Sequence, residues 1–148
     1  MKKKVLGKKL FAVLLVLAIL IGGLTACRAG NKYKVDGGNI MYNDKGKIFW
    51  CDRSVTNAEI PEQLPDKNGK DIPIVGIGAN AFNRCTALES ITIPGTVTSI
   101  EDKAFHGCSA LTEVNFEGSE ADWTAMTGEM TDENDNAPLL AATINFGK

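Results

Sequence analysis

The sequence holds little of the chemistry that enzymes and metal sites need. Its 148 residues include a single histidine, His106, and no C-x-x-C pair of cysteines. Metal sites built on imidazole or thiolate ligands are therefore not expected. No serine or carboxylate stands in a motif that would join His106 in a catalytic triad, and its slot in the chain is expected to be a surface corner. We therefore expect neither an enzyme nor a bound cofactor.

Cysteines are few and show no disulfide pattern. Besides Cys27 they are Cys51, Cys85 and Cys108, an odd number without close spacing. A fold held together by disulfides is thus not expected. Cys85 and Cys108 occupy equivalent places in two similar segments, which leaves two interpretations open. They form a disulfide, or they fill the interior as small apolar thiols, and the second interpretation is the favoured one.

The longest apolar run is too short to cross a membrane comfortably. LFAVLLVLAILI follows a lysine-rich start and precedes GGLTAC, the layout of an export signal. Leu24-Thr25-Ala26-Cys27 resembles the bacterial lipobox. The resemblance implies cleavage before Cys27 and a lipid on its thiol, which would anchor the chain to a membrane outside the cytoplasm, at the cell surface or in the periplasm. An ordinary secretory signal with a chance cysteine is the alternative.

Basic residues are scarce outside the export signal. Five of the 16 lysines and arginines lie in the signal, which leaves 11 against 18 acidic residues and a net charge of about −7. Nucleic acid is excluded as a partner, because phosphate backbones require a basic face. The acidic segment TDENDNAP resembles a calcium loop, but Ala137 occupies the place that needs glycine. A solvated acidic loop is therefore favoured.

Two nearly identical segments lie 23 residues apart. They are AFNRCTALESITI at 81–93 and AFHGCSALTEVNF at 104–116. The positions that agree are almost all apolar, whereas the polar positions between them vary. Such a period indicates a solenoid, in which each coil stacks its inward side chains on those of the next. Phe82 and Phe105 are accordingly expected to be buried and close together.

Each segment also contains a strand with one buried face. Ile91 and Ile93 alternate with Thr92, and related segments predict four parallel strands near residues 60, 91, 114 and 144. Outward residues then form two short ladders on the exposed sheet face, the usual binding surface of a solenoid. These candidate binding residues are Ser90, Thr92, Glu113, Asn115, Thr143 and Asn145. The alternative is that they are merely soluble strand-forming residues.

The segment IPGTVTSIEDKAFHGCSALTEVNF resembles the BspA-like, or treponemal-type, leucine-rich repeat. That unit has 23 residues and the form L-x-x-I-x-I-P-x-x-V-x-x-I-x-x-x-A-F-x-x-C, and the likeness covers residues 60–117. It implies bacterial surface proteins, some of which are adhesins. The segment EQLPDKNGKD departs from the period and is expected to form a loop.

We therefore expect a β-rich (α/β) leucine-rich-repeat solenoid. A short parallel β-sheet should have helical turns on its opposite side, with a small antiparallel N-terminal cap and a C-terminal cap that contains Trp123. The expected divisions are a lipoprotein signal peptide at 1–26, a lipidated tether at 27–32, the N-terminal β cap at 33–58, the repeats at 59–118, and an irregular last repeat with its cap at 119–148.

The segment GIGANA at 76–81 fits the nucleotide-binding fingerprint G-x-G-x-x-A but lacks the surrounding βαβ unit, so no nucleotide is expected. Gly76 is expected at a tight corner instead. The sequence thus predicts a membrane-anchored lipoprotein that displays a short repeat module for protein or glycan recognition, as an adhesin does. The alternative is a structural or assembly factor of the bacterial cell envelope that binds another bacterial protein.

Overall fold

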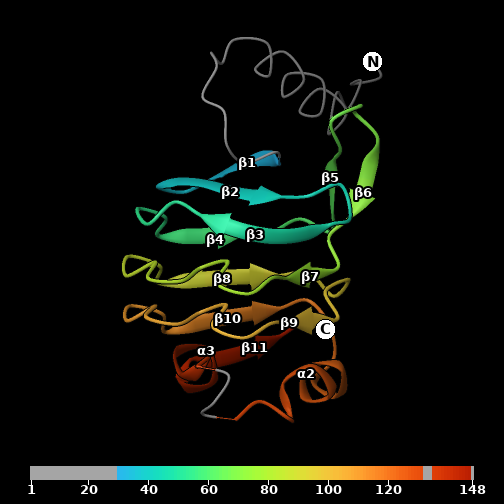
Figure 1. Cartoon of the computed structure of the whole chain (residues 1–148). Helices are drawn as coiled ribbons and strands as arrows, with labels where there is room; N and C mark the ends of the chain where they lie inside the picture. Colours follow the sequence, from blue (N-terminus) through green and yellow to red (C-terminus); the bar gives the residue numbers. More distant parts are fainter. Residues whose placement is uncertain (1–29, 132–134, 148) are drawn as a thin grey trace, which may run out of the picture.

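The computed structural model describes residues 30–131 and 135–147, and they form a stack of coils (Figure 1). Four parallel strands make one side of the stack: β4 (Asn57–Glu59), β8 (Ser90–Ile93), β10 (Glu113–Phe116) and β11 (Thr143–Phe146). They are ordered β11-β10-β8-β4, so each strand pairs with its equivalent in the next coil. The predicted parallel strands are confirmed, and the first of them ends just before Ile60.

A second sheet forms the other side, and the sequence did not predict it. Its five strands are β1 (Asn31–Val35), β2 (Gly38–Tyr42), β3 (Lys47–Cys51), β7 (Gly76–Ile77) and β9 (Ser99–Ile100). The first three form an antiparallel meander, whereas β3, β7 and β9 are parallel. The segment opposite the four-stranded sheet was expected to contain helical turns. In the regular coils it contains these short strands and hydrogen-bonded turns.

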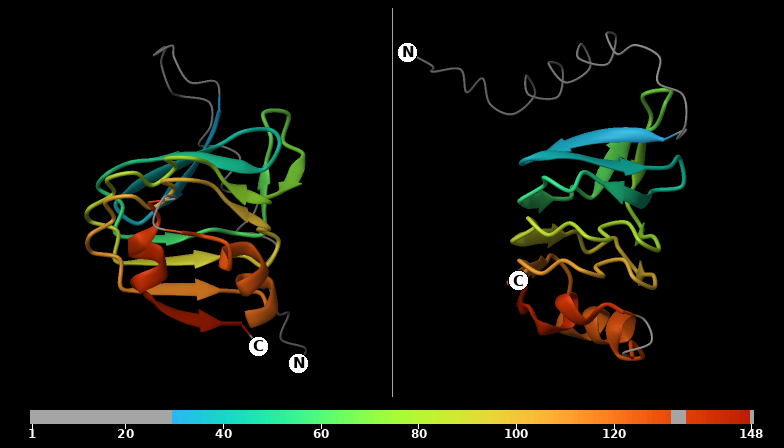
Figure 2. Two further views of the ribbon diagram at one scale, coloured as in Figure 1. Left: turned by 60° about the horizontal axis from the view of Figure 1, so that its bottom comes forward. Right: turned by 60° about the vertical axis from the view of Figure 1, so that its left-hand side comes forward.

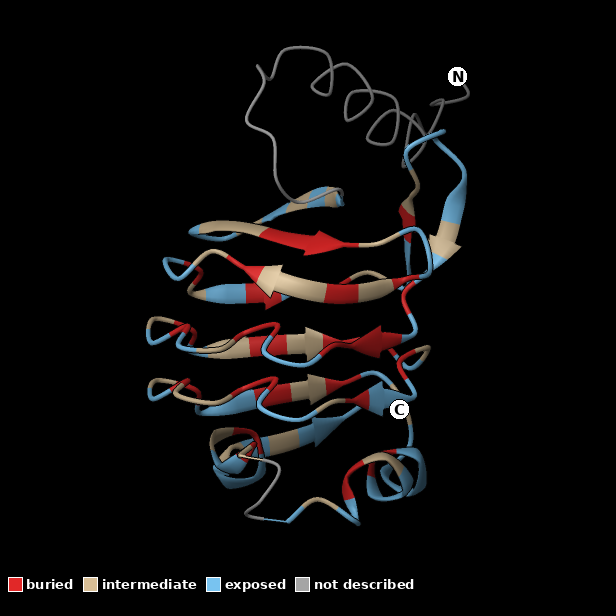
Figure 3. Cartoon of the chain, viewed as in Figure 1, coloured by how far each residue is buried: buried red, intermediate tan, exposed pale blue. Residues whose placement is uncertain are grey.

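The core lies between the two sheets and repeats from coil to coil. Phe82 and Phe105 are fully buried, and their rings stack. Ile91 and Val114 are likewise fully buried, and they pair in the register of β8 and β10. The side chains that alternate with them along each strand are exposed or half-buried, as Figure 3 shows for the four-stranded sheet. The stacking that the 23-residue period predicts is therefore confirmed.

The segment expected to be a loop instead forms a hairpin. Its strands are β5 (Gln63–Pro65) and β6 (Asp71–Pro73), which pair antiparallel and project from the side of the stack (Figure 2). Leu64 is buried, and the Tyr42 hydroxyl donates a 2.7 Å hydrogen bond to the carbonyl of Pro65. One apolar side chain and one hydrogen bond thus fasten the insertion to the meander.

Two short helices cover the C-terminal end of the stack (Figure 2). Helix α2 (Glu120–Thr127) begins at a capping box, in which Ser119 and Asp122 exchange hydrogen bonds. Its Trp123 is buried against Phe116, with ring centroids 5.3 Å apart. Helix α3 (Ala137–Ala141) buries its leucine at position 139. Neither helix has the length and apolar character needed to cross a lipid bilayer.

Asn136 closes the last regular coil. Between neighbouring coils, the amide of Phe82 donates to the carbonyl of Ala104 at 2.8 Å. The equivalent amide of Phe105 has no further regular coil beneath it, and it donates to the Asn136 side-chain oxygen at 3.0 Å instead. The Asn136 amide nitrogen in turn donates to the carbonyl of Glu101 at 3.0 Å. One buried side chain therefore replaces the backbone of a missing coil.

Gly76 does not form the tight corner expected from the sequence. It lies in β7, where a Cβ atom would come within 2.7 Å of the Ser99 hydroxyl on the adjacent strand. The glycine is required because the neighbouring coil approaches closely, not because the backbone turns.

Candidate functional site

The register of the four-stranded sheet brings the six candidate binding residues together. Glu113 lies between Ser90 and Thr143 in one row, and Asn115 lies between Thr92 and Asn145 in the other. All six are exposed or half-buried. The structure therefore places them in two straight ladders along the outward face of the sheet.

The sequence interpretation missed two members of these ladders. Asn57 pairs with Ser90, and Glu59 pairs with Thr92, so β4 extends both rows by one residue. The matching pairs Ile60-Pro61 and Ile93-Pro94 mark equivalent positions after the two strands, so the sequence did contain the information needed to find these residues. Counting back from the two Ile-Pro pairs to equal positions would have found both residues. They were missed because the inserted hairpin lengthens this coil by ten residues.

The polar groups at the C-terminal end of the ladders bind one another. The Asn115 amide donates to the Glu113 carboxylate at 3.0 Å, and the Asn145 amide donates to the same carboxylate at 3.2 Å. Asn145 also donates to the Asn115 side-chain oxygen at 3.0 Å. This network fixes the side chains in a flat arrangement and leaves the Glu113 carboxylate exposed as an acceptor.

A groove of about 280 Å³ lies at the other end of the ladders, next to β1. We call it the Tyr33 groove, and its lining residues are Tyr33, Lys34, Val35, Asp36, Asn57, Ala58, Glu59, Ser90 and Thr92. Ser90 donates to the Asn57 side-chain oxygen at 2.8 Å within it. Two of the candidate residues, Ser90 and Thr92, thus lie in this hollow of the face.

The electrostatics of the Tyr33 groove are acidic. Asp36 and Glu59 contribute carboxylates, and Lys34 contributes the one cation of its lining. Burial raises the pKa of the Tyr33 hydroxyl, and the negative charge of Glu59 raises it further. Tyr33 therefore remains a neutral donor beside a carboxylate. The groove is suited to a partner that brings hydrogen-bond donors or positive charge.

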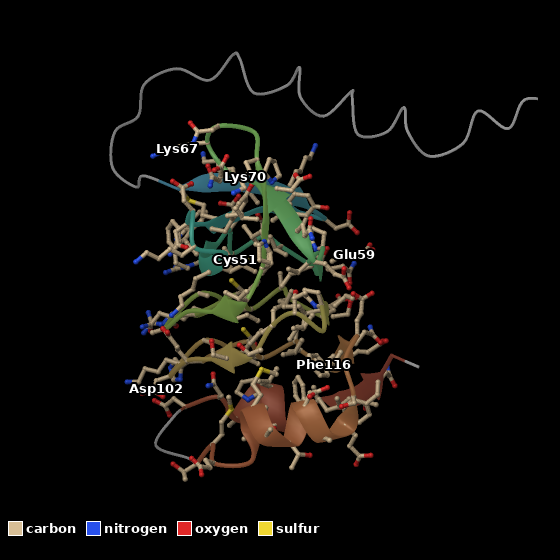
Figure 4. All side chains as sticks on the ribbon, turned by 90° about the vertical axis from the view of Figure 1, so that its right-hand side faces the viewer. Cys51, Glu59, Lys67, Lys70, Asp102 and Phe116 are labelled. Carbon is tan, nitrogen blue, oxygen red and sulfur yellow. The ribbon has the colours of Figure 1, made fainter. Side chains whose placement is uncertain are left out.

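The three described cysteines form a column inside the stack, because the thiols of Cys51 and Cys85 both contact the carbonyl of Asp52 and the Cys108 thiol contacts the preceding coil. Figure 4 labels the first of them, Cys51. The Cys108 thiol donates to the carbonyl of Phe82 in the previous coil at 3.1 Å, and the Cys51 thiol donates to the carbonyl of Asp52 at the same distance. All three are free and buried. Cys51 was not expected to join the pair at 85 and 108.

Burial makes the thiols of Cys51 and Cys108 poor nucleophiles at neutral pH. It raises the pKa of Cys108 to about 12, with a further contribution from Cys85. Hydrogen bonding with Cys85, together with burial, also raises the pKa of Cys51. The hydrogen bond with Cys51 lowers the pKa of Cys85, but the Cys85 side chain is fully buried and shielded from reagents. The column therefore acts as interior filling.

The remaining candidate residues from the sequence do not come together in a site within the described part of the chain. His106 is half-buried, and its Nδ1 lies 3.9 Å from an Asp135 carboxylate oxygen. Within residues 30–131 and 135–147, no three His, Cys, Asp or Glu side chains are grouped so that they could hold a metal ion. Cys27, the expected lipidation site, lies outside the described residues.

Comparisons with known proteins agree with this geometry. Residues 72–124 match the family model described as BspA type leucine-rich repeat region (6 copies). No curated protein matches the chain. A leucine-rich repeat protein from Bacteroides capillosus has a similar solved structure, with a TM-score of 0.50 and 20% identity over 79% of this chain and 99% of that one.

Two further solved structures resemble the chain more distantly. A leucine-rich cell surface protein from Faecalibacterium prausnitzii has a TM-score of 0.45 and 22% identity over 68% of this chain and 30% of its own. A leucine-rich repeat protein from Bacteroides ovatus has a TM-score of 0.41 and 25% identity over 62% of this chain and 23% of its own. The stacked coils, the 23-residue period and the family match lead to one conclusion: the chain has a leucine-rich repeat fold, and its residues 72–124 match the BspA type of that repeat.

Proposed function

We propose that the chain is a binding module, displayed outside the cytoplasm, that recognises a protein through the outward face of its four-stranded sheet. The observation that carries this proposal is the continuity of the two polar ladders with the Tyr33 groove. Leucine-rich repeat proteins generally bind proteins, and the exposed sheet face of a solenoid is a usual binding surface.

The chemistry of this face favours a partner segment that donates hydrogen bonds. Asp36, Glu59 and Glu113 supply carboxylates, and Asn57 and Asn115 supply amide oxygens. An extended protein segment with basic and amide side chains satisfies these acceptors. A glycan is the alternative partner, since its hydroxyl groups also donate.

An array of matrix proteins and glycans tests the proposal directly. The chain is compared with Thr92→Lys, which places an ammonium group in the Tyr33 groove, and with Thr124→Lys, which adds the same charge on the exposed side of α2. We expect binding to fall at least tenfold for Thr92→Lys and to persist for Thr124→Lys. Equal binding by both variants, or no binding by the parent chain, contradicts the proposal.

The proposal includes a lipid anchor at Cys27, which makes the protein membrane-bound and adhesin-like. It rests on the Leu24-Thr25-Ala26-Cys27 tetrad after the apolar run. Replacing Cys27 with serine removes the thiol that carries the lipid. The protein is expected to move from the membrane fraction to the soluble fraction of fractionated cells. If the serine variant stays with the membrane, the anchor is not a lipid on Cys27.

The two ends of the stack act as caps in this proposal. The meander of β1 to β3 covers the first coil, and α2 covers the last one through the contact of Trp123 with Phe116. Changing Trp123 to alanine is expected to promote aggregation, measured by light scattering, because Phe116 becomes exposed. Unchanged solubility and stability would contradict this role.

An open strand edge supports the alternative function as an envelope assembly factor. β11 is the last strand of its sheet, and it carries Phe146, which is 38% exposed. Leu140 is 46% exposed nearby in sequence. Such an edge can accept a strand from another protein. If Phe146→Lys abolishes capture of an envelope protein whereas Thr92→Lys does not, the alternative holds.

A further inference from the structure

A second groove, of about 450 Å³, lies between the end of β3 and the turn at 79–84. We call it the Trp50 groove; besides Cys51, Ala79 and Ala81, its lining residues are Phe49, Trp50, Arg53, Asn80, Asn83 and Arg84. It shares no residue with the Tyr33 groove. The amide of Asn80 donates to the carbonyl of Asp102, and Figure 4 shows Asp102 and Glu59 on opposite sides of the stack.

A β-bulge presents two aromatic side chains at this groove. Met41 pairs with Trp50 and Tyr42 pairs with Ile48, so Phe49 is the extra residue in β3. Ile48 is fully buried, whereas Phe49 and Trp50 are only half-buried. Bulges re-aim side chains, and here both rings remain partly accessible at the groove.

Two positive charges lie beside these rings without a neutralising partner. Arg53 and Arg84 are two of the three arginines in the sequence. Neither forms a salt bridge within the described part of the chain, and the lining contains no carboxylate. The nearby Asp52 carboxylate is already engaged by Asn39, through bonds of 2.9 and 2.8 Å. Both guanidinium groups are therefore available to an anion.

Arg84 occupies a backbone position that favours glycine. Its φ is +60°, in the left-handed region, and the equivalent residue one period later is Gly107, with a φ of +73°. Inter-coil hydrogen bonding holds this conformation, since the amide of Arg84 donates to the carbonyl of His106 at 2.7 Å. An arginine at such a place is disfavoured by the backbone alone, and glycine would adopt this conformation without strain.

A buried acceptor in the groove also lacks a partner. The Asn83 amide nitrogen donates to the Asn80 side-chain oxygen at 2.8 Å, but the Asn83 oxygen is buried and accepts no hydrogen bond. Buried polar atoms are normally satisfied, so this oxygen has unused capacity to accept a hydrogen bond.

We propose that the Trp50 groove binds an acidic saccharide, with the sugar carboxylate on Arg53 and Arg84, a ring face on Trp50, and hydroxyl groups on Asn80 and Asn83. Planar guanidinium groups bind carboxylates in a bidentate manner. The groove is lined mostly by polar atoms, so it offers no deep apolar site for the aliphatic or aromatic anchors on which peptide binding depends. A saccharide needs only the one aromatic face together with hydrogen-bonding groups.

The test uses the full-length chain, purified in a neutral detergent, and calorimetric titration. The probe is a trimer of galacturonic acid, and the matched probe is its methyl ester, which has the same rings without charge. We expect the acid to bind at least about tenfold more tightly than the ester, because the charge-assisted contacts are lost in the ester. An acidic peptide, hexaglutamate, is titrated in parallel.

Arg84→Gly is the informative variant. It restores the residue that the repeat carries at position 107, so the unfolding midpoint is expected to stay the same or rise, whereas affinity for the trimer falls at least about tenfold. Arg53→Gln is expected to weaken binding similarly. Lys70→Gln, which removes one positive charge on the exposed hairpin, should leave affinity unchanged (Figure 4).

Three results would overturn the proposal. These are equal binding of acid and ester, full affinity in Arg84→Gly, and tighter binding of hexaglutamate than of the trimer. The last would identify the groove as a site for acidic peptides. None of these three results bears on the sheet face, because the Trp50 groove shares no lining residue with the Tyr33 groove. Binding at the sheet face is tested separately by Thr92→Lys, which alters the Tyr33 groove alone.

Discussion

The rings of Phe82 and Phe105 lie parallel, with centroids 5.1 Å apart and planes inclined by 3°. This spacing is close to the separation of about 4.8 Å between paired strands. Both rings are fully buried. One sequence period therefore corresponds to one coil, and each phenylalanine supports its equivalent in the next coil.

Removing one ring of this stack should destabilise the whole solenoid. Phe105→Ala is expected to lower the free energy of unfolding by about 3–5 kcal/mol, because it leaves a cavity between coils. Guanidinium unfolding followed by circular dichroism measures the loss. Phe146→Ala is the matched control and should cost under about 1 kcal/mol, since Phe146 is 38% exposed. Equal losses in the two variants would refute coil stacking as the main source of stability.

The Asn136 side chain should contribute more to the free energy of unfolding than its size suggests. Asn136→Ala leaves the buried Phe105 amide without its partner and removes one of the two hydrogen bonds to the Glu101 carbonyl, and we expect a loss of about 1–3 kcal/mol. Hydrogen exchange at the Phe105 amide should accelerate as well. Asn68→Ala, on the exposed turn of the hairpin, serves as the control and should change neither quantity. Unchanged exchange at Phe105 would show that this amide has another partner.

The cysteine column should resist alkylation until the protein unfolds. In a Cys27→Ser chain without added reductant, iodoacetamide at pH 8 is expected to leave Cys51, Cys85 and Cys108 unmodified in the native state, because burial shields them and raises the pKa of Cys108 to about 12. After unfolding, mass spectrometry should find all three labelled. Two residues that remain unlabelled after unfolding would indicate a disulfide.

Acid should weaken the hydrogen bonds that the Glu101 carboxylate accepts from the neighbouring coil. Its carboxylate accepts hydrogen bonds from the Lys47 ammonium and from the Ala79 amide, and these lower its pKa below the ordinary value of 4.5. A lowered pKa in the folded state means that the contribution is present above pH 4.5 and is lost as pH falls through the folded pKa.

Glu101→Gln should therefore be less stable than the parent at pH 7, and the two should converge in acid. Urea unfolding between pH 7 and pH 3 measures this difference. Glu129→Gln removes an exposed carboxylate from the chain beyond α2 and should leave the pH profile unchanged. A constant gap between the parent chain and Glu101→Gln at every pH would exclude the ionic contribution.

The outward ladders show how far sequence reasoning reaches into the candidate site. Ser90 and Glu113 could be paired from the sequence because they hold equal places in a 23-residue period. Asn57 belongs to the same row, but the inserted hairpin separates it from Ser90 by 33 residues. Tyr33 lies outside the repeat, so no period relates it to the groove that it lines.

The sequence by itself determined the period, the parallel strands and the inward side chains. It could do so because successive coils must place equivalent apolar residues at the same depth, and this requirement leaves a repeated pattern in the chain. Only the tertiary structure decided the second sheet, the role of Asn136, the cysteine at position 51 and the two grooves. These features depend on single contacts between coils and the flanking segments, and a contact made once leaves no periodic signal.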